Sequence, residues 1–456
     1  MTRSVIIVGS ARALRAALDG GRIADRSIVG AVLIGPGEVA VPIVARAATW
    51  HSIALDQGCA HALLLAEPPP NGAAARALLE RAAEAGLRVE LWHADEARPL
   101  RLDDLLGAPL CAVDWARIRA IIEGKRILIT GGGGSIGSEL ARRIAALAPE
   151  RLALLDSSEH NLYQVGLELR DARILLCDVR DGAAVRRWFA REAPEIVFHT
   201  AALKQVPIVE SFPSEGVLTN ICGLRNVAEA ADAIGAHLIF VSTDKAVEPS
   251  GIMGATKRFG ELYCQALDRR GAHRAIPVRL GNVLGSAGSV VPLFEAQLAA
   301  GGPLTVTHAE MTRYFLSIPQ AADALLQAAA KGLTSPRRGA AKVIEMGEAL
   351  PVVELARSII RLAGKRPHED VPIVYTGLRP GEKVHEQLVA RDESPEIDAG
   401  SGVIAAMSAP RSLAELHETI ERLSLLARQG ADEAVRETLF AAIGVREEAA
   451  ALAAAG

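Results

Sequence analysis

The sequence predicts an α/β protein built from two doubly wound parallel sheets, and three observations lead to this prediction. Short apolar runs alternate with segments of helical periodicity along most of the chain, which is typical of such sheets. At two places, residues 5–9 and 127–131, an apolar run ends in a glycine turn and a helix-like pattern follows. The 456 residues also leave room for about three domains at ~150 residues each.

The composition excludes several classes of protein. The 50 Lys and Arg residues nearly balance the 54 Asp and Glu residues, so the net charge of −4 argues against a nucleic-acid partner. Apolar residues make up 50% and charged residues 23%, which excludes a disordered chain. No run approaches the ~18 apolar residues of a membrane span, and the first twenty residues carry no signal-peptide pattern.

The five cysteines point to a reducing compartment. They are Cys59, Cys111, Cys177, Cys222 and Cys264, which lie far apart and form no CxxC pair. Neither a disulfide framework nor a zinc site fits this spacing, and we expect a cytoplasmic protein.

The first Rossmann-like unit is expected over residues 1–96. Its apolar runs are the candidate strands 5–9, 28–34, 62–66 and 89–92. Its turn keeps only Gly9 and places Arg12 and Arg15 in the following helix, so it lacks the glycines that let a pyrophosphate approach. We therefore expect a structural or oligomerising role for this unit, and a linker over residues 97–123.

The second unit, over residues 124–400, alternates strands and helices more regularly. Candidate strands are residues 126–130, 151–155, 173–177, 195–199, 237–242 and 276–280. From about residue 285 the pattern becomes irregular, as is common in a smaller substrate lobe. Residues 401–456 are expected to form a C-terminal helical segment that ends in an Ala-rich tail.

The glycine turn of the second unit predicts a dinucleotide site. Gly131, Gly134 and Gly137 are spaced as GxxGxxG between a strand and a helix, and Ser135 and Ile136 open that helix. Glycine allows backbone to approach a pyrophosphate, and a helix N-terminus offers free N–H groups and partial positive charge. Alone, these glycines could simply make a tight turn; the strand–turn–helix context favours the cofactor.

An acidic residue after the second strand favours NAD. Asp156 follows Gly131 by 25 residues and ends the second strand, where a carboxylate can accept a hydrogen bond from a ribose 2′-OH. It would repel the 2′-phosphate of NADP. Asp178 and Val179, after the third strand, are candidates to flank the adenine.

A reactive group of residues follows the fifth strand. Thr243, Asp244 and Lys245 stand at its carboxyl end, which is where doubly wound sheets carry their chemistry. Lys257 follows Met253 by four residues, so both lie on one face of the next helix. In isolation Thr-Asp-Lys could be a solvated loop with a salt bridge; its position favours catalysis.

This arrangement resembles the extended short-chain dehydrogenases/reductases, in which a Ser or Thr is followed by Tyr-xxx-Lys. The resemblance implies that fold for the second unit, with a smaller C-terminal substrate lobe. Met253 stands where that family has its tyrosine, and methionine has no proton to exchange. On its own, Met253 would be an ordinary core residue.

The chain also resembles the large nucleotide-sugar 4,6-dehydratases of bacterial polysaccharide and glycan biosynthesis, over about residues 103–390. These carry Thr-Asp-Lys followed by Met-Gly-Ala-Thr-Lys-Arg, the residues found here at 243–245 and 253–258. Further motifs follow in order: Leu-Leu-Gly at 105–107, Thr-Ala-Ala-Leu-Lys-Gln-Val-Pro at 200–207, Val-Arg-Leu-Gly-Asn-Val-Leu-Gly-Ser at 278–286, Glu-Met-Thr-Arg-Tyr-Phe at 310–315 and Thr-Gly-Leu-Arg-Pro-Gly-Glu-Lys at 376–383. Residues 202–205 read Ala-Leu-Lys-Gln, where relatives often have Ala-Tyr-Lys-His.

The resemblance implies an NAD-dependent lyase that removes water from UDP-N-acetylglucosamine. It implies Lys245 as the base at C5 and Asp244 as the acid at C6, with Thr243 on the C4 hydroxyl and Lys257 on the nicotinamide ribose. The base that deprotonates the C4 hydroxyl stays open, and Asp244 is our candidate. Further cofactor contacts are expected at two neighbouring residues, Ala201 and Ala202.

Four residues are candidates for binding the substrate. Arg313 and Arg379 are expected at the diphosphate, because guanidinium groups match phosphate oxygens. Lys204 and Asn282 are weaker candidates for the sugar or the diphosphate. None of the eleven histidines lies in an HExxH pattern, so we expect no catalytic metal.

Two other functions stay open. A nucleotide-sugar 4-epimerase would need a proton shuttle at C4 that Met253 cannot supply. A non-catalytic, NAD-bound scaffold in glycan assembly would not need the intact Thr243, Asp244, Lys245 and Lys257.

The large dehydratases usually carry membrane-spanning helices ahead of the first unit, and this sequence starts at that unit. We therefore expect no integral membrane segment, and any attachment to the inner face of the membrane to be peripheral and through partners. A homo-oligomer is also expected.

Overall fold

The computed structural model describes residues 3–19, 26–33, 44–46, 61–65, 72–84, 87–93, 96–106, 113–397 and 402–444. Cys59, Cys111, the ends of two predicted strands (Ile34 and Ala66) and the Ala-rich tail lie outside these residues. Among the helices described, none is long and apolar enough to cross a membrane.

The chain divides into two compact units, each built from several segments. Unit 1 comprises residues 1–109, 290–310 and 350–376, and unit 2 comprises residues 110–289, 311–349 and 377–456. Two segments expected in the substrate lobe of the second unit therefore pack with the N-terminal region. Sequence periodicity cannot show this, because it reports only on neighbours along the chain.

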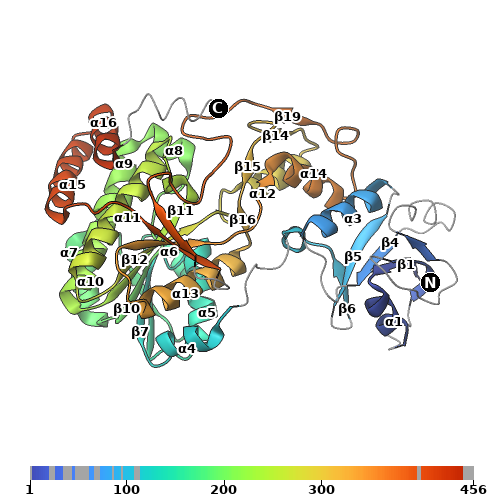
Figure 1. Ribbon diagram of the computed structural model, residues 1–456, viewed down its shortest axis with the longest axis horizontal. Coiled ribbons are helices and arrows are strands. Elements are labelled where there is room, and N and C mark those ends of the chain that lie inside the picture. The colour runs from blue at the N-terminus through green and yellow to red at the C-terminus, as the bar shows by residue number, and fades with distance from the viewer. Residues whose placement is uncertain are drawn as a thin grey trace. The chain divides into compact units, whose positions relative to one another are not determined.

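Unit 1 contains a sheet with the strand order β3-β2-β1-β4-β5-β6. Figure 1 labels β1, β4, β5 and β6 of this sheet. Pairing is parallel from β3 to β5, and β6 is antiparallel to β5. Its N-terminal elements are β1 (Arg3–Gly9), α1 (Ala11–Asp19), β2 (Arg26–Leu33), β3 (Val44–Arg46), β4 (His61–Leu65), α3 (Gly72–Glu84), β5 (Arg88–His93), β6 (Glu96–Pro99) and η1 (Leu102–Leu105). The predicted strands of this region are confirmed within the residues described, whereas the short β3 and β6 were not predicted.

The later segments of unit 1 add helices and short strands to it. They contribute α12 (Val290–Ala299), β14 (Leu304–Val306), β18 (Leu350–Pro351), α14 (Val352–Leu362) and β19 (Ile373–Tyr375). Helix α14 lies against α3, where Leu362 joins the apolar cluster of Leu78 and Leu79. Arg361 and Glu80 add an ion pair of 2.5 Å between these two helices.

Unit 2 is built on a nine-stranded sheet in the order β20-β21-β17-β12-β11-β10-β7-β8-β9. Its strands are β7 (Arg126–Thr130), β8 (Arg151–Asp156), β9 (Arg173–Leu176), β10 (Ile196–His199), β11 (His237–Thr243), β12 (Ala275–Leu280), β17 (Ala340–Ile344), β20 (Ser394–Ile397) and β21 (Val403–Met407). The strands from β17 to β9 are parallel, and β21 is antiparallel to β17. All six strands predicted for this unit are present, which confirms the doubly wound fold.

Helices cover both faces of this sheet. They are α4 (Trp115–Ile122), α5 (Ser135–Ala145), α6 (Glu159–Glu168), α7 (Gly182–Glu192), α8 (Val206–Ser211), α9 (Pro213–Val217), the π-helix η2 (Leu218–Cys222), α10 (Gly223–Ile234), η3 (Asp244–Ala246), α11 (Ile252–Arg270), α13 (Ile318–Thr334), α15 (Leu413–Arg428) and α16 (Asp432–Ile443). Three two-residue strands, β13 (Asn282–Val283), β15 (Thr312–Arg313) and β16 (Phe315–Leu316), complete the unit.

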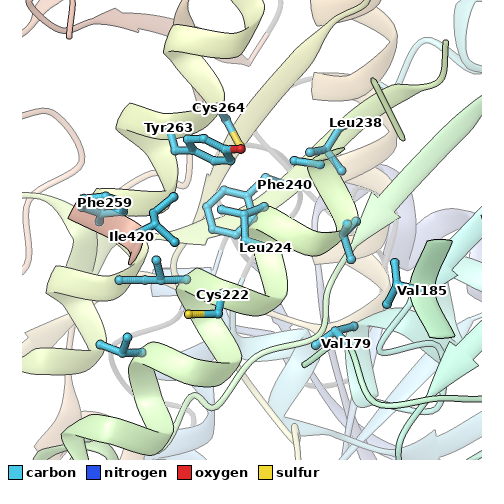
Figure 2. Close-up of a cluster of buried hydrophobic side chains, with 14 of the residues drawn as sticks. Val179, Val185, Cys222, Leu224, Leu238, Phe240, Phe259, Tyr263, Cys264 and Ile420 are labelled. Carbon is cyan, nitrogen blue, oxygen red and sulfur yellow. The ribbon is translucent and has the colours of Figure 1, made fainter. Parts of the chain in front are cut away.

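Alternation along β11 divides the core into two clusters, because successive strand residues face opposite sides of a sheet. Leu238 and Phe240 join one cluster, and Ile239 and Val241 join the other. Figure 2 shows Phe240 among Leu224 of α10, Phe259 and Tyr263 of α11 and Ile420 of α15.

The expected C-terminal helical segment forms α15 and α16, which pack on α9, η2 and α11. Asp432 at the start of α16 accepts hydrogen bonds from the backbone N–H and the hydroxyl of Ser214. Arg436 donates to Oε2 of Glu210, and Oε1 of Glu210 accepts from the N–H of Ile252, the first residue of α11. The C-terminal helices therefore help to fix the start of α11.

Candidate active site

The glycine turn lies at the point where the strand order of unit 2 reverses, between β7 and β10. Gly131 has a φ of +68°, and a Cβ there would lie 2.6 Å from the backbone N of Ala201. A Cβ on Gly133 would lie 2.6 Å from Cβ of Asn161. Only glycine fits these positions, and the turn leaves backbone N–H groups at the start of α5. This cradle fits the pyrophosphate of a dinucleotide.

Asp156 ties this turn to the end of β8. Its Oδ2 accepts from the N–H of Gly133 at 3.0 Å, and its Oδ1 accepts from the N–H of Ser158 at 2.9 Å. Each carboxylate oxygen keeps a second lone pair, so the expected bond to a ribose hydroxyl remains open.

The other predicted cofactor residues are placed in different ways. Ile136 packs partly buried against the core, and the Ser135 hydroxyl accepts from the N–H of Ala287 at 3.2 Å. Asp178 forms an ion pair with Arg180. Burial would raise the pKa of Asp178, but the hydrogen bonds and charge of Arg180 outweigh this and lower it. Val179 is buried in the core.

At the end of β10, the chain is bonded to the glycine turn. The Thr200 hydroxyl donates to the carbonyl oxygens of Thr130 and Gly131, which places Ala201 beside the turn. The half-buried Ala202 follows it. Thr130 and the buried His199 share a hydrogen bond of 2.6 Å. Burial, followed by the charge of Lys257, lowers the pKa of His199 to about 3, so its imidazole is neutral.

The predicted Thr-Asp-Lys turn lies at the end of β11 and continues into η3. Asp244 is fully buried, and its Oδ1 accepts from the Thr243 hydroxyl at 2.9 Å and from Nζ of Lys245 at 3.0 Å. Its Oδ2 is buried without a hydrogen-bond partner among the described residues. The turn therefore holds a carboxylate and an amine in contact, with one acceptor oxygen free.

Lys245 is held from three sides. Besides Asp244, its Nζ donates to Oδ1 of Asn282 at 2.7 Å and lies 3.9 Å from Oε1 of Glu386. Asn282 was expected to contact the substrate, and the structure brings it to the proposed base. Glu386 was not predicted, although it follows Lys383, the last residue of the motif at 376–383, by three residues.

Met253 and Lys257 lie on the first turns of α11, both buried. Met253 belongs to the apolar core cluster. Nζ of Lys257 donates to the carbonyl of Val241 at 3.0 Å and lies 4.7 Å from the ring centre of Phe240. Burial lowers the pKa of Lys257 to about 8, although the charges of Cys264 and Glu261 oppose this shift.

Asn220 is a second residue that sequence reasoning missed. Its side chain in η2 accepts from the N–H of Leu203 and donates to the carbonyl of the same residue, at 2.8 and 2.9 Å. It also donates to the hydroxyl of Thr256 on α11 at 3.0 Å. Asn220 thus joins the segment that carries Lys204 to the helix that carries Lys257.

The two residues predicted at the diphosphate have different surroundings. Arg313 is buried, and its guanidinium donates to the carbonyls of Thr312, Lys383 and Val384. These bonds stabilise the backbone at residues 383–384. Arg379 is exposed.

Lys204 is exposed, and its Nζ donates to the Ser286 hydroxyl at 3.1 Å. Partial desolvation of the amine lowers its pKa. The bond to Ser286 links the 200–207 motif with the 278–286 motif.

Comparison with known proteins gives the family context. A family model described as polysaccharide biosynthesis protein matches residues 127–407. The chain is 40% identical over 370 residues to the probable polysaccharide biosynthesis protein EpsC of Bacillus subtilis, covering 78% of this chain and 59% of EpsC. It is 41% identical over 305 residues to the capsular polysaccharide biosynthesis protein CapD of Staphylococcus aureus, covering 65% of this chain and 50% of CapD. The chain thus spans between a half and three-fifths of these two relatives.

Solved structures share the fold. Pen from Bacillus thuringiensis matches with a TM-score of 0.57 and 29% identity, over 66% of this chain and 98% of Pen. A double mutant of the dTDP-glucose 4,6-dehydratase DesIV from Streptomyces venezuelae, with NAD bound, matches with a TM-score of 0.51 and 23% identity. That match covers 58% of this chain and 88% of DesIV, and it bears on the fold alone.

Proposed function

Because the chain belongs to the polysaccharide biosynthesis protein family, we propose that it is an NAD-dependent nucleotide-sugar 4,6-dehydratase acting on UDP-N-acetylglucosamine. One observation carries this proposal: a buried carboxylate and an amine lie 3.0 Å apart at the carboxyl end of β11. An elimination needs an acid and a base acting on neighbouring carbons, and Asp244 and Lys245 can supply both. Met253, in the position that carries a tyrosine in related dehydrogenases, has no proton to offer.

The backbone of the glycine turn would hold the pyrophosphate of NAD, Asp156 its adenosine ribose and Lys257 its nicotinamide ribose. When bound, NAD supplies a hydride acceptor for C4 of the sugar and later a hydride donor for C6. Lys204 and Asn282 would contact the sugar, and Arg379 the diphosphate.

Asp244 carries the proton of the C4 hydroxyl. Thr243 orients this hydroxyl, and the carboxylate of Asp244 takes its proton as C4 is oxidised to the ketone. The ketone acidifies the proton at C5. Asp244 is then protonated and ready to act as an acid.

Lys245 and Asp244 then act together on the 4-keto sugar. The neutral amine of Lys245 takes the C5 proton, while Asp244 returns its proton to the C6 hydroxyl, which leaves as water. C6 would receive hydride from the reduced cofactor, and the ammonium group of Lys245, whose protons exchange with solvent, would donate one of them to C5. Asp244 ends as a carboxylate and Lys245 as a neutral amine, so protons balance over the cycle and one water molecule is released.

Incubation with UDP-N-acetylglucosamine in deuterated water tests this proposal. We expect a 4-keto-6-deoxy product that has lost water and carries one solvent deuterium at C5, read by mass spectrometry and NMR. An unchanged sugar, or a product without deuterium at C5, would contradict the proposal.

A 4-epimerase is the second candidate, because the chain is 33% identical to the UDP-glucose 4-epimerase of Rickettsia akari over 284 residues, 80% of that protein. Inversion at C4 without loss of water, giving the galacto sugar, would support this alternative in the same experiment.

A further inference from the structure

Glu386 is a buried carboxylate between two lysines. Only 3% of its side chain is exposed, and its Oε1 lies 3.9 Å from Nζ of Lys245. Its Oε2 lies 3.3 Å from Nζ of Lys383 and makes no hydrogen bond within the described part of the chain. Burying a charge is costly unless opposite charges lie nearby, so these contacts hold the carboxylate in place.

Lys383 anchors this carboxylate to the catalytic turn. Its Nζ donates to the carbonyl of Val247 at 2.7 Å, directly after η3. Arg313 fixes the same segment by donating to the carbonyls of Lys383 and Val384. The position of Glu386 relative to Asp244 and Lys245 is therefore set by bonds from two directions.

The charge around Lys245 changes during the proposed reaction. Among the described residues, Asp244 and Glu386 are the carboxylates facing Nζ of Lys245, and Asn282 is neutral. Lys383 pairs with Glu386, and Lys257 donates to the carbonyl of Val241. When Asp244 holds the C4 proton, it is uncharged. Glu386 is then the anionic neighbour left to Lys245 at the moment its amine must take the C5 proton.

We propose that Glu386 is a positioning residue that stabilises the ammonium group formed on Lys245 as it takes the C5 proton. This inference rests on the proposed dehydratase function and deepens it. Glu386 touches no reacting atom; it acts through Lys245, by charge and by orienting Nζ.

The test compares kcat against pH for Glu386→Gln, Lys383→Met and the wild type with UDP-N-acetylglucosamine. In Glu386→Gln the amine loses its proton more readily, so the rising limb of the profile should move about one unit lower. The plateau should fall about tenfold, because the amine is a weaker base, while KM changes little. Lys383→Met removes a positive charge, so its rising limb should move upward.

Two further variants guard against a purely structural effect. Glu386→Asp keeps the charge, so it should restore the position of the limb even if its rate is low. Asp392→Asn removes an exposed carboxylate of the same segment and should match the wild type. The inference is overturned if the rising limbs of the pH profiles coincide in all variants. It is also overturned if the limbs of Glu386→Gln and Lys383→Met move in the same direction. A wild type that releases no water would instead contradict the proposed function itself.

Discussion

At the scale of single residues, Asp244 combines two properties that rarely occur together. It is fully buried, and one of its carboxylate oxygens lacks a hydrogen-bond partner among the described residues. An unpaired buried acceptor costs free energy unless a substrate group completes it. The proposed mechanism uses this oxygen for the proton of the C4 hydroxyl.

Replacing Asp244 with Asn should lower the rate of water loss by at least ~10²–10⁴-fold, the usual contribution of one acid–base group. The amide has nearly the same shape but cannot carry the proton from C4 to C6. NAD affinity should not change. Asp171→Asn, at an exposed turn, is the control and should behave as the wild type. Turnover near the wild-type rate in Asp244→Asn would remove Asp244 from the mechanism.

Lys257 makes stability depend on pH, because burial lowers its pKa to about 8 from an ordinary value of 10.5. Between these values the unfolded chain binds the proton and the folded protein does not, so the free energy of unfolding rises with pH. Below pH 8 both states bind the proton, so the full free-energy cost of burying the charged amine opposes folding. Relative to Lys257→Met, the wild type should gain about 3 kcal/mol between pH 8 and 10.5 in urea unfolding. Parallel stability curves for the two proteins would mean that the buried amine stays charged.

At the scale of elements, the glycines of the turn differ in how closely other parts of the fold surround them. A Cβ on Gly134 would meet only the carbonyl oxygen of Gly131, at 3.2 Å, whereas Gly131 and Gly133 face closer contacts. The backbone at Gly134 can therefore accept a methyl group after a small shift, but a bound pyrophosphate would have to give way.

Gly134→Ala should fold normally and lose most of its affinity for NAD, measured by calorimetric titration. Gly166→Ala, on α6, is the matched control. A Cβ at this position would meet the side chain of Ile174 at an ordinary distance of 3.4 Å. It should leave NAD binding unchanged. Unaltered affinity in Gly134→Ala would place the pyrophosphate elsewhere.

Local patterns in the sequence predicted the elements of unit 2, because strands, turns and helix starts depend on neighbouring residues. They could not predict partners that meet only in the fold. Arg279 lies in a predicted strand, yet it is fully buried and donates to Glu261 on α11 and to Glu393, which is 114 residues away. Glu386 escaped attention for the same reason, since no periodicity marks a carboxylate that meets Lys245 from a distant segment.

At the scale of the whole molecule, unit 1 combines the N-terminal sheet with segments expected in the substrate lobe. Within this unit, α14 packs on α3. Changes at this contact should therefore affect unit 1 while leaving the glycine turn of unit 2 intact.

Leu362→Asp should destabilise unit 1, because it puts a charge against the apolar residues Leu78 and Leu79. We expect a new unfolding transition at lower temperature in calorimetry and an unchanged affinity for NAD. Glu80→Gln removes only the ion pair with Arg361, and the Glu80 side chain is half exposed. This change should lower the free energy of unfolding by less than ~1 kcal/mol. Loss of NAD binding in Leu362→Asp would contradict this separation.

The same interleaving has a consequence for synthesis on the ribosome. Helix α3 emerges early, but its partner α14 follows only after most of the nine-stranded sheet has been translated. The N-terminal region must therefore wait with an apolar surface uncovered while the sheet of unit 2 assembles, and contacts this distant in sequence close slowly. The nascent chain is thus most in need of chaperones during this interval.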